Sequence, residues 1–167
     1  LSGREILEQN GIPLSDAVSG YLELETSDPV RTRLATSISY NSPGKKAATT
    51  VPMLAQSYRE TTIAQVAQTL DDSLYTGLVI VNPNPEPVRV MIEAYGADGI
   101  LRREKALDIP AHSRLIDMLR SETFFGLDYE QVKGHVRIRS DQKLFTYAAF
   151  GDSKGQFMAT IEGQKAE

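Results

Sequence analysis

Two histidines and one pair of aspartates are the side chains in this chain whose types suit acid–base catalysis or metal binding. His135 lies in a segment of alternating residues, on the face that also carries Arg137, so a solvated strand position explains it better than a catalytic base. His112 lies in a predicted loop, and no motif places an acid or a nucleophile beside it. Asp71 and Asp72 could contribute to a calcium site, but the residues around them lack the spacing of a calcium-binding loop. We therefore predict no catalytic residue, no metal site and no cofactor.

Tyrosines near the ends of predicted strands could form a platform for a sugar, because an aromatic face covers the apolar C–H groups of a sugar ring. The candidate glycan contacts are Tyr75, Tyr95 and Tyr129. The chain has no tryptophan and aromatic residues make up only 7% of it, which favours residues at the rim of a core. Glycan binding is therefore an alternative to the leading expectation.

Composition limits the classes of protein to which the chain can belong. Hydrophobic residues make up 41% of its 167 residues, which is enough to build a packed core and argues against disorder. The 18 Lys and Arg residues are scattered under a net charge of −4, which argues against nucleic acid as a partner. No apolar run is long enough to be inserted in a membrane. The absence of cysteine excludes disulfides and is compatible with an exported bacterial protein.

Alternating apolar and polar residues predict an all-β chain. Strands are expected at 19–27, 30–40, 47–54, 61–68, 75–82, 88–95, 100–109, 133–140, 143–151 and 156–163. Two short helices are expected at 3–9, with Ser2 and Glu5 as a capping box, and at 114–119, with Ser113 as the cap. The predicted core comprises Val79, Val81, Val90, Ile92, Val136, Ile138, Ala148 and Phe150, while Ile80 is expected to face the other way.

The stretch TGLVIVNPNPEPVRVMIEAYGADG, residues 76–99, shows how turns separate the strands. Asn82 and the prolines after it end one strand, because proline lacks a donor and biases the residue before it away from helix. Asp98 and Gly99 predict a hairpin turn, since Gly readily adopts the positive φ that such turns need. These features serve folding, and none of them requires a substrate.

Two parts of the chain follow the same plan. Gly20 matches Gly134, 114 residues later, and the Ala-Thr pair at 48–49 matches that at 159–160, 111 residues later. A predicted short helix precedes each copy, and a period of roughly 110 residues suits a seven-strand sandwich. We therefore expect residues 1–56 to be the second half of one module, a short helix and about three strands, and residues 58–163 to be a complete module. The half-module needs upstream residues or a partner to complete its sheet.

The repeat also pairs residues of opposite charge. Glu23 and Glu25 occupy the positions that Arg137 and Arg139 occupy in the second copy, on the outward face of the predicted strand. Complementary faces of this kind would allow neighbouring modules, or two copies of the chain, to meet. These four residues are therefore the predicted interaction face.

Several motifs in residues 58–163 resemble the tandem immunoglobulin-like or fibronectin-like modules of bacterial secreted and cell-surface proteins. They are TTIAQVAQ, the stretch at 76–99 with its Asn-Pro strand end, ALDIPAHSRLIDML and GHVRIRSDQKLFTYAAFGD. The order of elements is also similar to that of the small sandwich of sensory rhodopsin transducer proteins. The resemblance implies an antiparallel β-sandwich with short helices between strands, and it implies no particular ligand.

The leading expectation is a non-catalytic β-sandwich module, outside the cell or in the cell envelope of a bacterium, that acts as a spacer, scaffold or adhesive unit. Its expected partners are neighbouring modules or another copy of the chain. The alternatives are a carbohydrate-binding accessory domain of a secreted enzyme and a small cytoplasmic signalling adaptor. An enzyme is not expected.

Overall fold

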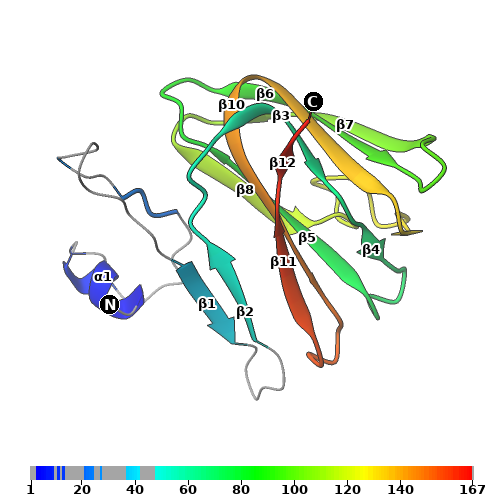
Figure 1. Cartoon of the computed structure of the whole chain (residues 1–167), viewed down its shortest axis with the longest axis horizontal. Helices are drawn as coiled ribbons and strands as arrows, with labels where there is room; N and C mark the ends of the chain where they lie inside the picture. Colours follow the sequence, from blue (N-terminus) through cyan, green and yellow to red (C-terminus); the bar gives the residue numbers. More distant parts are fainter. Residues whose placement is uncertain are drawn as a thin grey trace.

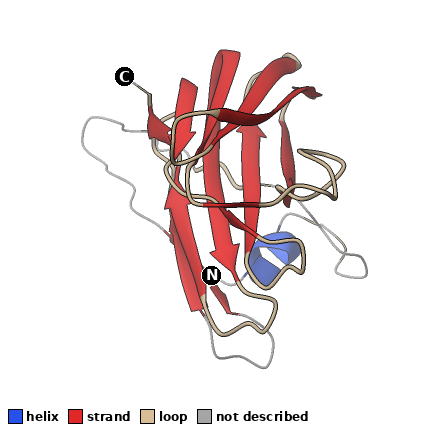
Figure 2. Ribbon diagram, turned by 90° about the vertical axis from the view of Figure 1, so that its right-hand side faces the viewer, coloured by secondary structure: helices blue, strands red, loops and turns tan. Residues whose placement is uncertain are grey.

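The computed structural model describes residues 3–9, 11, 13, 21–24, 27, 37–41 and 48–166 (Figure 1). In chain order the elements are α1 (Gly3–Gln9), β1 (Ser37–Asn41), β2 (Ala48–Pro52), β3 (Tyr58–Ile63), β4 (Ala67–Gln68), β5 (Tyr75–Asn82), β6 (Val88–Tyr95), β7 (Leu101–Ile109), β8 (Ser113–Met118), β9 (Gln131–Val132), β10 (His135–Gly151), β11 (Met158–Glu162) and β12 (Gln164–Lys165). Strands make up nearly all of this regular structure, as Figure 2 shows in red, and α1 is the one helix in the described part. The predicted all-β class is confirmed at this level.

Every pair of neighbouring strands is antiparallel. β1 pairs with β2, and β4 with β9, in two small two-stranded sheets. The other eight strands form one sheet in which the order β12-β3-β10-β5-β8 is extended by β11 and β6 on β10 and by β7 on β6. Antiparallel ladders of this kind allow a short turn between successive strands, such as β6 and β7.

The long strand β10 joins two halves of the eight-stranded sheet. Its first part, 135–140, pairs with β3 and β6, and its last part, 145–151, pairs with β5 and β11. The register with β3 shifts between Arg139 and Leu144, where the strand passes from one half to the other. A strand that changes partners at an irregularity is how antiparallel sheets turn corners.

A single core cluster takes residues from both halves of this sheet. It includes Ile92 and Ile138 on the β6–β10 side and Ile80 and Ala148 on the β5–β10 side, each at most 2% exposed. All eight residues predicted to be core are buried: Val79, Val81, Val90, Ile92, Val136, Ile138, Ala148 and Phe150. Burial of this cluster removes its apolar side chains from water and is the main source of stability.

The face assigned to β5 was wrong. Leu78 and Ile80 belong to the core cluster, whereas Val79 and Val81 are buried on the opposite face of the strand. Val79 pairs with Tyr147 of β10, and directly paired residues share a face of the sheet. Because β5 is apolar on both faces, its sequence does not alternate between apolar and polar residues, and the face that points to the core cannot be predicted from it.

The helix predicted at 114–119 is also wrong, because these residues belong to strand β8. Ser113 does not cap a helix but pairs with Asn82 at the first position of the ladder with β5. Leu115 packs against the core and Ile116, 51% exposed, points away from it. A helix of six residues is not stable by itself, whereas the β5 ladder satisfies the backbone of this segment residue by residue.

Other predicted strands differ in their limits. Residues 21–24 form no strand, and Leu22 and Leu24 are 56% and 55% exposed. The strand expected at 61–68 divides into β3 and β4, while the two expected at 133–151 merge into β10. Helix 3–9 is confirmed, and Gly11, at φ 68°, donates its N–H to the carbonyl of Glu8 at the end of the helix. Three predicted features lie outside the described residues: the capping residue Ser2, the repeat residue Gly20 and most of the strand expected at 30–40.

The proline-rich loop after β5 is organised by one buried side chain. Asn82 is fully buried, and its amide donates to the carbonyls of Glu86, Ile109 and Pro110 at 2.9–3.2 Å. Its own carbonyl oxygen accepts from both nitrogens of Asn84. Asn82, which was predicted to end a strand, therefore also connects the loop to the end of β7 through hydrogen bonds. The predicted turn is present as well, with Gly99 at φ 75° between β6 and β7.

Candidate functional site

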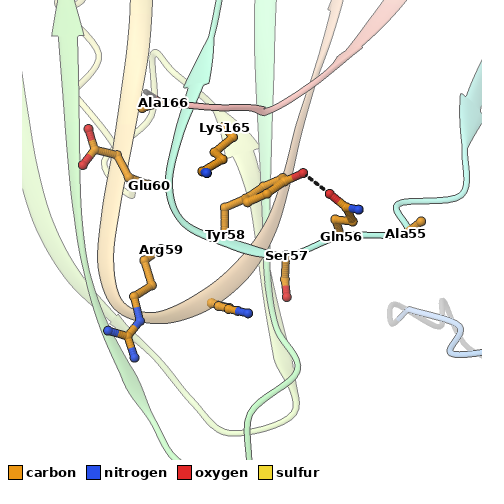
Figure 3. Close-up of a pocket in the computed structure, with 9 residues that line it drawn as sticks. Ala55, Gln56, Ser57, Tyr58, Arg59, Glu60, Lys165 and Ala166 are labelled. Carbon is orange, nitrogen blue, oxygen red and sulfur yellow. Dashed lines mark hydrogen bonds between the residues drawn. The ribbon is translucent and has the colours of Figure 1, made fainter.

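A hollow of about 680 Å³ lies where the segment before β3 passes the bend of β10 and the end of the chain (Figure 3). Nine residues line it: Ala55, Gln56, Ser57, Tyr58, Arg59, Glu60, Lys143, Lys165 and Ala166. Tyr58 stands in the middle of the group in Figure 3, and its hydroxyl donates to the side-chain carbonyl of Gln56. The hollow exists because β3, β10 and β12 are neighbours in the sheet although they lie far apart in the sequence.

The lining of this hollow is basic in a chain that is acidic as a whole. Arg59, Lys143 and Lys165 are exposed, and none of them has an ion-pair partner within the described part of the chain. The one carboxylate in the lining, Glu60, is already paired with Arg137. Exposed cations in the lining of one hollow suit a carboxylate or phosphate group better than a neutral ligand. The lining offers binding groups and holds no nucleophile next to a base.

The two arginines of the predicted interaction face are paired within the chain. Arg137 binds Glu60 of β3, and Arg139 makes a bidentate pair with Glu93 of β6 through bonds of 2.6 and 3.1 Å. The hydrogen bond that Arg137 donates to Glu60 raises the pKa of Arg137, and the bonds that Arg139 donates to Glu93 raise the pKa of Arg139. The Glu93 side chain is only 8% exposed, so Arg139 supplies the charge that a buried carboxylate requires. These pairs tie the first part of β10 to β3 and β6.

The acidic half of that predicted face is placed differently. Glu23 is exposed on the irregular segment 21–24, and Glu25 lies outside the described residues. The strand that was expected to match 135–139 is therefore absent at 21–24, and the structure does not bring Glu23 to Arg137 or Arg139. Contact between copies through these charges stays a prediction.

The three predicted glycan contacts lie in three separate places. Tyr129 is 2% exposed, its ring packs at 4.8 Å on Phe125, and burial raises the pKa of its hydroxyl, so it presents no face to a sugar. Tyr95 stacks on His135 at 5.1 Å on the outer face of the sheet. Tyr75 lies over Gly151, where an added Cβ would come within 2.5 Å of its Cζ. No common platform joins these three rings.

The groups weighed as catalytic or metal-binding residues have structural partners. Asp72 accepts both a bidentate pair from Arg120, at 2.7 and 3.1 Å, and a bond from Gln68. Asp71 accepts from the backbone N–H of Ser73, and this bond is the main reason that its pKa falls to about 2. His112 is exposed at φ 48° in the loop between β7 and β8, and its backbone N–H donates to the carbonyl of Asn84. No group of metal-binding side chains occurs among the described residues.

A second, smaller cavity of about 110 Å³ lies between two hairpins. Thr50, Val51 and Leu54 line one side of it, and Tyr147 with residues 160–162 lines the other. At its edge the hydroxyl of Thr160 donates to the carbonyl of Thr50 at 3.0 Å, and the hydroxyls of Thr49 and Thr160 lie 3.4 Å apart. The β1–β2 hairpin therefore rests against the free side of β11, without a backbone ladder between them.

Sequence reasoning missed the hollow and the acidic partners of the arginines. Lys143 follows Arg59 by 84 residues and Lys165 follows Lys143 by 22, and nothing in their local sequences marks them as neighbours. Glu93 lies on the outward face of the strand expected at 88–95, and Glu60 directly precedes the strand expected at 61–68. The register that sets these carboxylates beside Arg137 and Arg139 could not be inferred from either segment.

None of the described helices is long and apolar enough to cross a membrane. No protein-family model matches the chain, and no curated protein matches it. Among solved structures, the chain is similar to Thermotoga maritima 1070, with 12% sequence identity and a TM-score of 0.51. The match covers 65% of this chain and 95% of that one. At this identity the likeness shows a shared fold over about two thirds of the chain and nothing about activity.

Proposed function

We propose that residues 58–163 form a two-layer, immunoglobulin-like β-sandwich and that the chain is a non-catalytic part of an exported or cell-surface bacterial protein. In this reading it acts as a spacer, scaffold or adhesive unit. The shared core between the two halves of the sheet supports the sandwich, because its residues come from β3, β6 and β10 on one side and from β5 and β10 on the other. The similarity to Thermotoga maritima 1070 covers 95% of that chain and 65% of this one, which supports a unit about the length of residues 58–163.

The observation that carries this proposal is the position of the β1–β2 hairpin. It pairs with no strand of the eight-stranded sheet, yet it lies against β11 through Thr49 and Thr50. A hairpin that belongs to a separate sheet and touches only the edge of the next one is the arrangement expected where consecutive modules adjoin. The function of such a contact is to set the spacing and angle between modules.

The hollow around Tyr58 favours a second candidate function, the binding of an acidic carbohydrate. The half-buried ring of Tyr58 and the exposed Lys143 and Lys165 in the same lining suit a sugar that carries a carboxylate group. This candidate replaces the three tyrosines selected from the sequence with Tyr58.

Isothermal titration of the full chain tests both candidates. With Zn²⁺, Ca²⁺ and nucleotides we expect no binding tighter than micromolar, whereas a stoichiometric metal held by His112 or by Asp71 and Asp72 would contradict the non-catalytic assignment. Titration with acidic oligosaccharides decides the second candidate. Binding that is lost in Lys143→Ala and Lys165→Ala but kept in the matched surface variant Lys154→Ala would favour it.

A further inference from the structure

The two hairpins that meet beside β11 are the equivalent hairpins of the internal repeat. Residues 48–49 match 159–160 at a spacing of 111, so Thr49 is the counterpart of Thr160. Six residues separate β1 from β2, and six separate β10 from β11. The hydroxyls of Thr49 and Thr160 lie 3.4 Å apart, so a residue of one copy touches its own counterpart in the other.

Contact between equivalent residues has a specific geometric meaning. Where units stack head to tail, a residue meets a different residue of the next unit, whereas across a two-fold axis it meets its own copy. The four strands lie in the order β1, β2, β11, β10. In the repeat β1 corresponds to the end of β10 and β2 corresponds to β11, so the order is symmetric about the contact between β2 and β11. In Figure 1, β2 and β11 run side by side in the same direction, as a two-fold axis parallel to the strands requires.

The contact is also loosely made. Its hydrogen bonds are those of Thr49, Thr50 and Thr160 beside a pocket of about 110 Å³, and no backbone ladder holds the hairpin to β11. The β1–β2 hairpin can therefore leave β11 at a lower cost than the loss of a paired strand.

We propose that the free side of β11 is a self-docking edge, and that a second copy of this chain places its own β11 there across a two-fold axis. Within one chain the β1–β2 hairpin, which is the equivalent hairpin of the preceding module, occupies this edge. The β11 strands of two copies therefore pair when the β1–β2 hairpin moves away. The inference rests on the repeat of modules in the proposed function. It implies that modules associate in closed pairs, because once two equivalent edges have met neither is left for a third module.

Engineered cysteines test this directly, since the native chain has none. The double variant Thr49→Cys/Thr160→Cys should form a disulfide within one chain, because the two hydroxyls that it replaces are already in contact. The variant Thr160→Cys/Leu54→Asp then exposes β11. Leu54 lines the cavity opposite Glu162, and a second carboxylate there opposes docking of the hairpin.

Under oxidising conditions Thr160→Cys/Leu54→Asp should form disulfide-linked dimers on the order of tenfold faster than Ser153→Cys/Leu54→Asp, because docking raises the effective concentration of one introduced thiol near its copy in the second chain. Ser153 is the matched control, exposed at the tip of the same hairpin but away from the axis. Val51→Asp provides a second means of releasing the hairpin, and maleimide labelling confirms that the thiol introduced at position 160 is accessible. Equal rates with an accessible thiol at that position, or failure of the intramolecular disulfide, would overturn the proposal. Neither result alters the titrations with metals and nucleotides, so the two proposals fail separately.

Discussion

Residues 21–24 and the strands after Tyr58 follow similar alternating patterns, but only the latter form a sheet. In 58–166, Val90, Ile92 and Val136 are completely buried in a cluster that several strands share. In 21–24, the alternating Leu22 and Leu24 remain more than half exposed and no strand forms. Both stretches alternate apolar and polar residues, so the pattern alone does not account for the difference.

The comparison shows that an alternating sequence becomes a strand when neighbours cover it. β-propensity measures how well a side chain fits a pleated, half-buried surface, and that surface is built by other strands. Residues 88–95 have β10 on one side and β7 on the other, whereas residues 21–24 pair with no described strand. The predictions below test whether this difference in neighbours controls the energetics.

The largest effect is expected from Ile138→Ala in the body of the sheet. Ile138 is 2% exposed and lies between Thr61 and Ile92, so truncation leaves a cavity at the centre of the core. We expect the free energy of unfolding to fall by about 2–5 kcal/mol in urea denaturation. The matched variant Leu22→Ala should change it by no more than about 0.5 kcal/mol. Equal effects would remove the energetic distinction between the two regions.

The next effect is expected from Asn82→Ala in the proline-rich loop. The variant leaves the carbonyls of Glu86, Ile109 and Pro110 without their donor, which should cost about 1–3 kcal/mol in the free energy of unfolding. Asn84→Ala is the control, because Asn84 is only half-buried, and it should cost less. If the control costs more, the loop does not depend on Asn82.

A smaller effect is expected from removing residues 1–57. Because β1 and β2 pair only with one another, residues 58–167 should fold alone with a melting temperature within about 4–8 °C of that of the full chain, the shift that about 1 kcal/mol produces. Circular dichroism during heating measures this. An unfolded 58–167 fragment would favour one larger domain over a module and a half.

The smallest effect concerns the turn at Asp71. The Ser73 N–H bond lowers the Asp71 pKa from 3.8 to about 2, so the folded state favours the ionised carboxylate. Its contribution to stability is therefore complete above pH 3.8 and is lost as the pH falls through about 2. The stability difference between the wild type and Asp71→Asn should shrink over this range, while NMR titration reports the pKa directly. A pKa at or above 3.8 would contradict the turn geometry.

Local sequence was sufficient for several elements. Strands 75–82 and 88–95 occur with the predicted limits, because each is a run of strand-favouring residues bounded by turn residues. The turn at Gly99 and the end of helix α1 before Gly11 depend on the positive φ that glycine adopts freely. The coarse all-β class and the burial of the eight chosen core residues follow from the same local chemistry.

Tertiary structure alone decided which residues face each other. Residues 113–118 form a strand because their backbone pairs with β5. Ile80 rather than Val79 faces the core, although β5 is apolar on both faces. Tertiary structure also gathered Arg59, Lys143 and Lys165 around one hollow. Register and layer order depend on the sum of many contacts between distant segments, and no single segment carries that information.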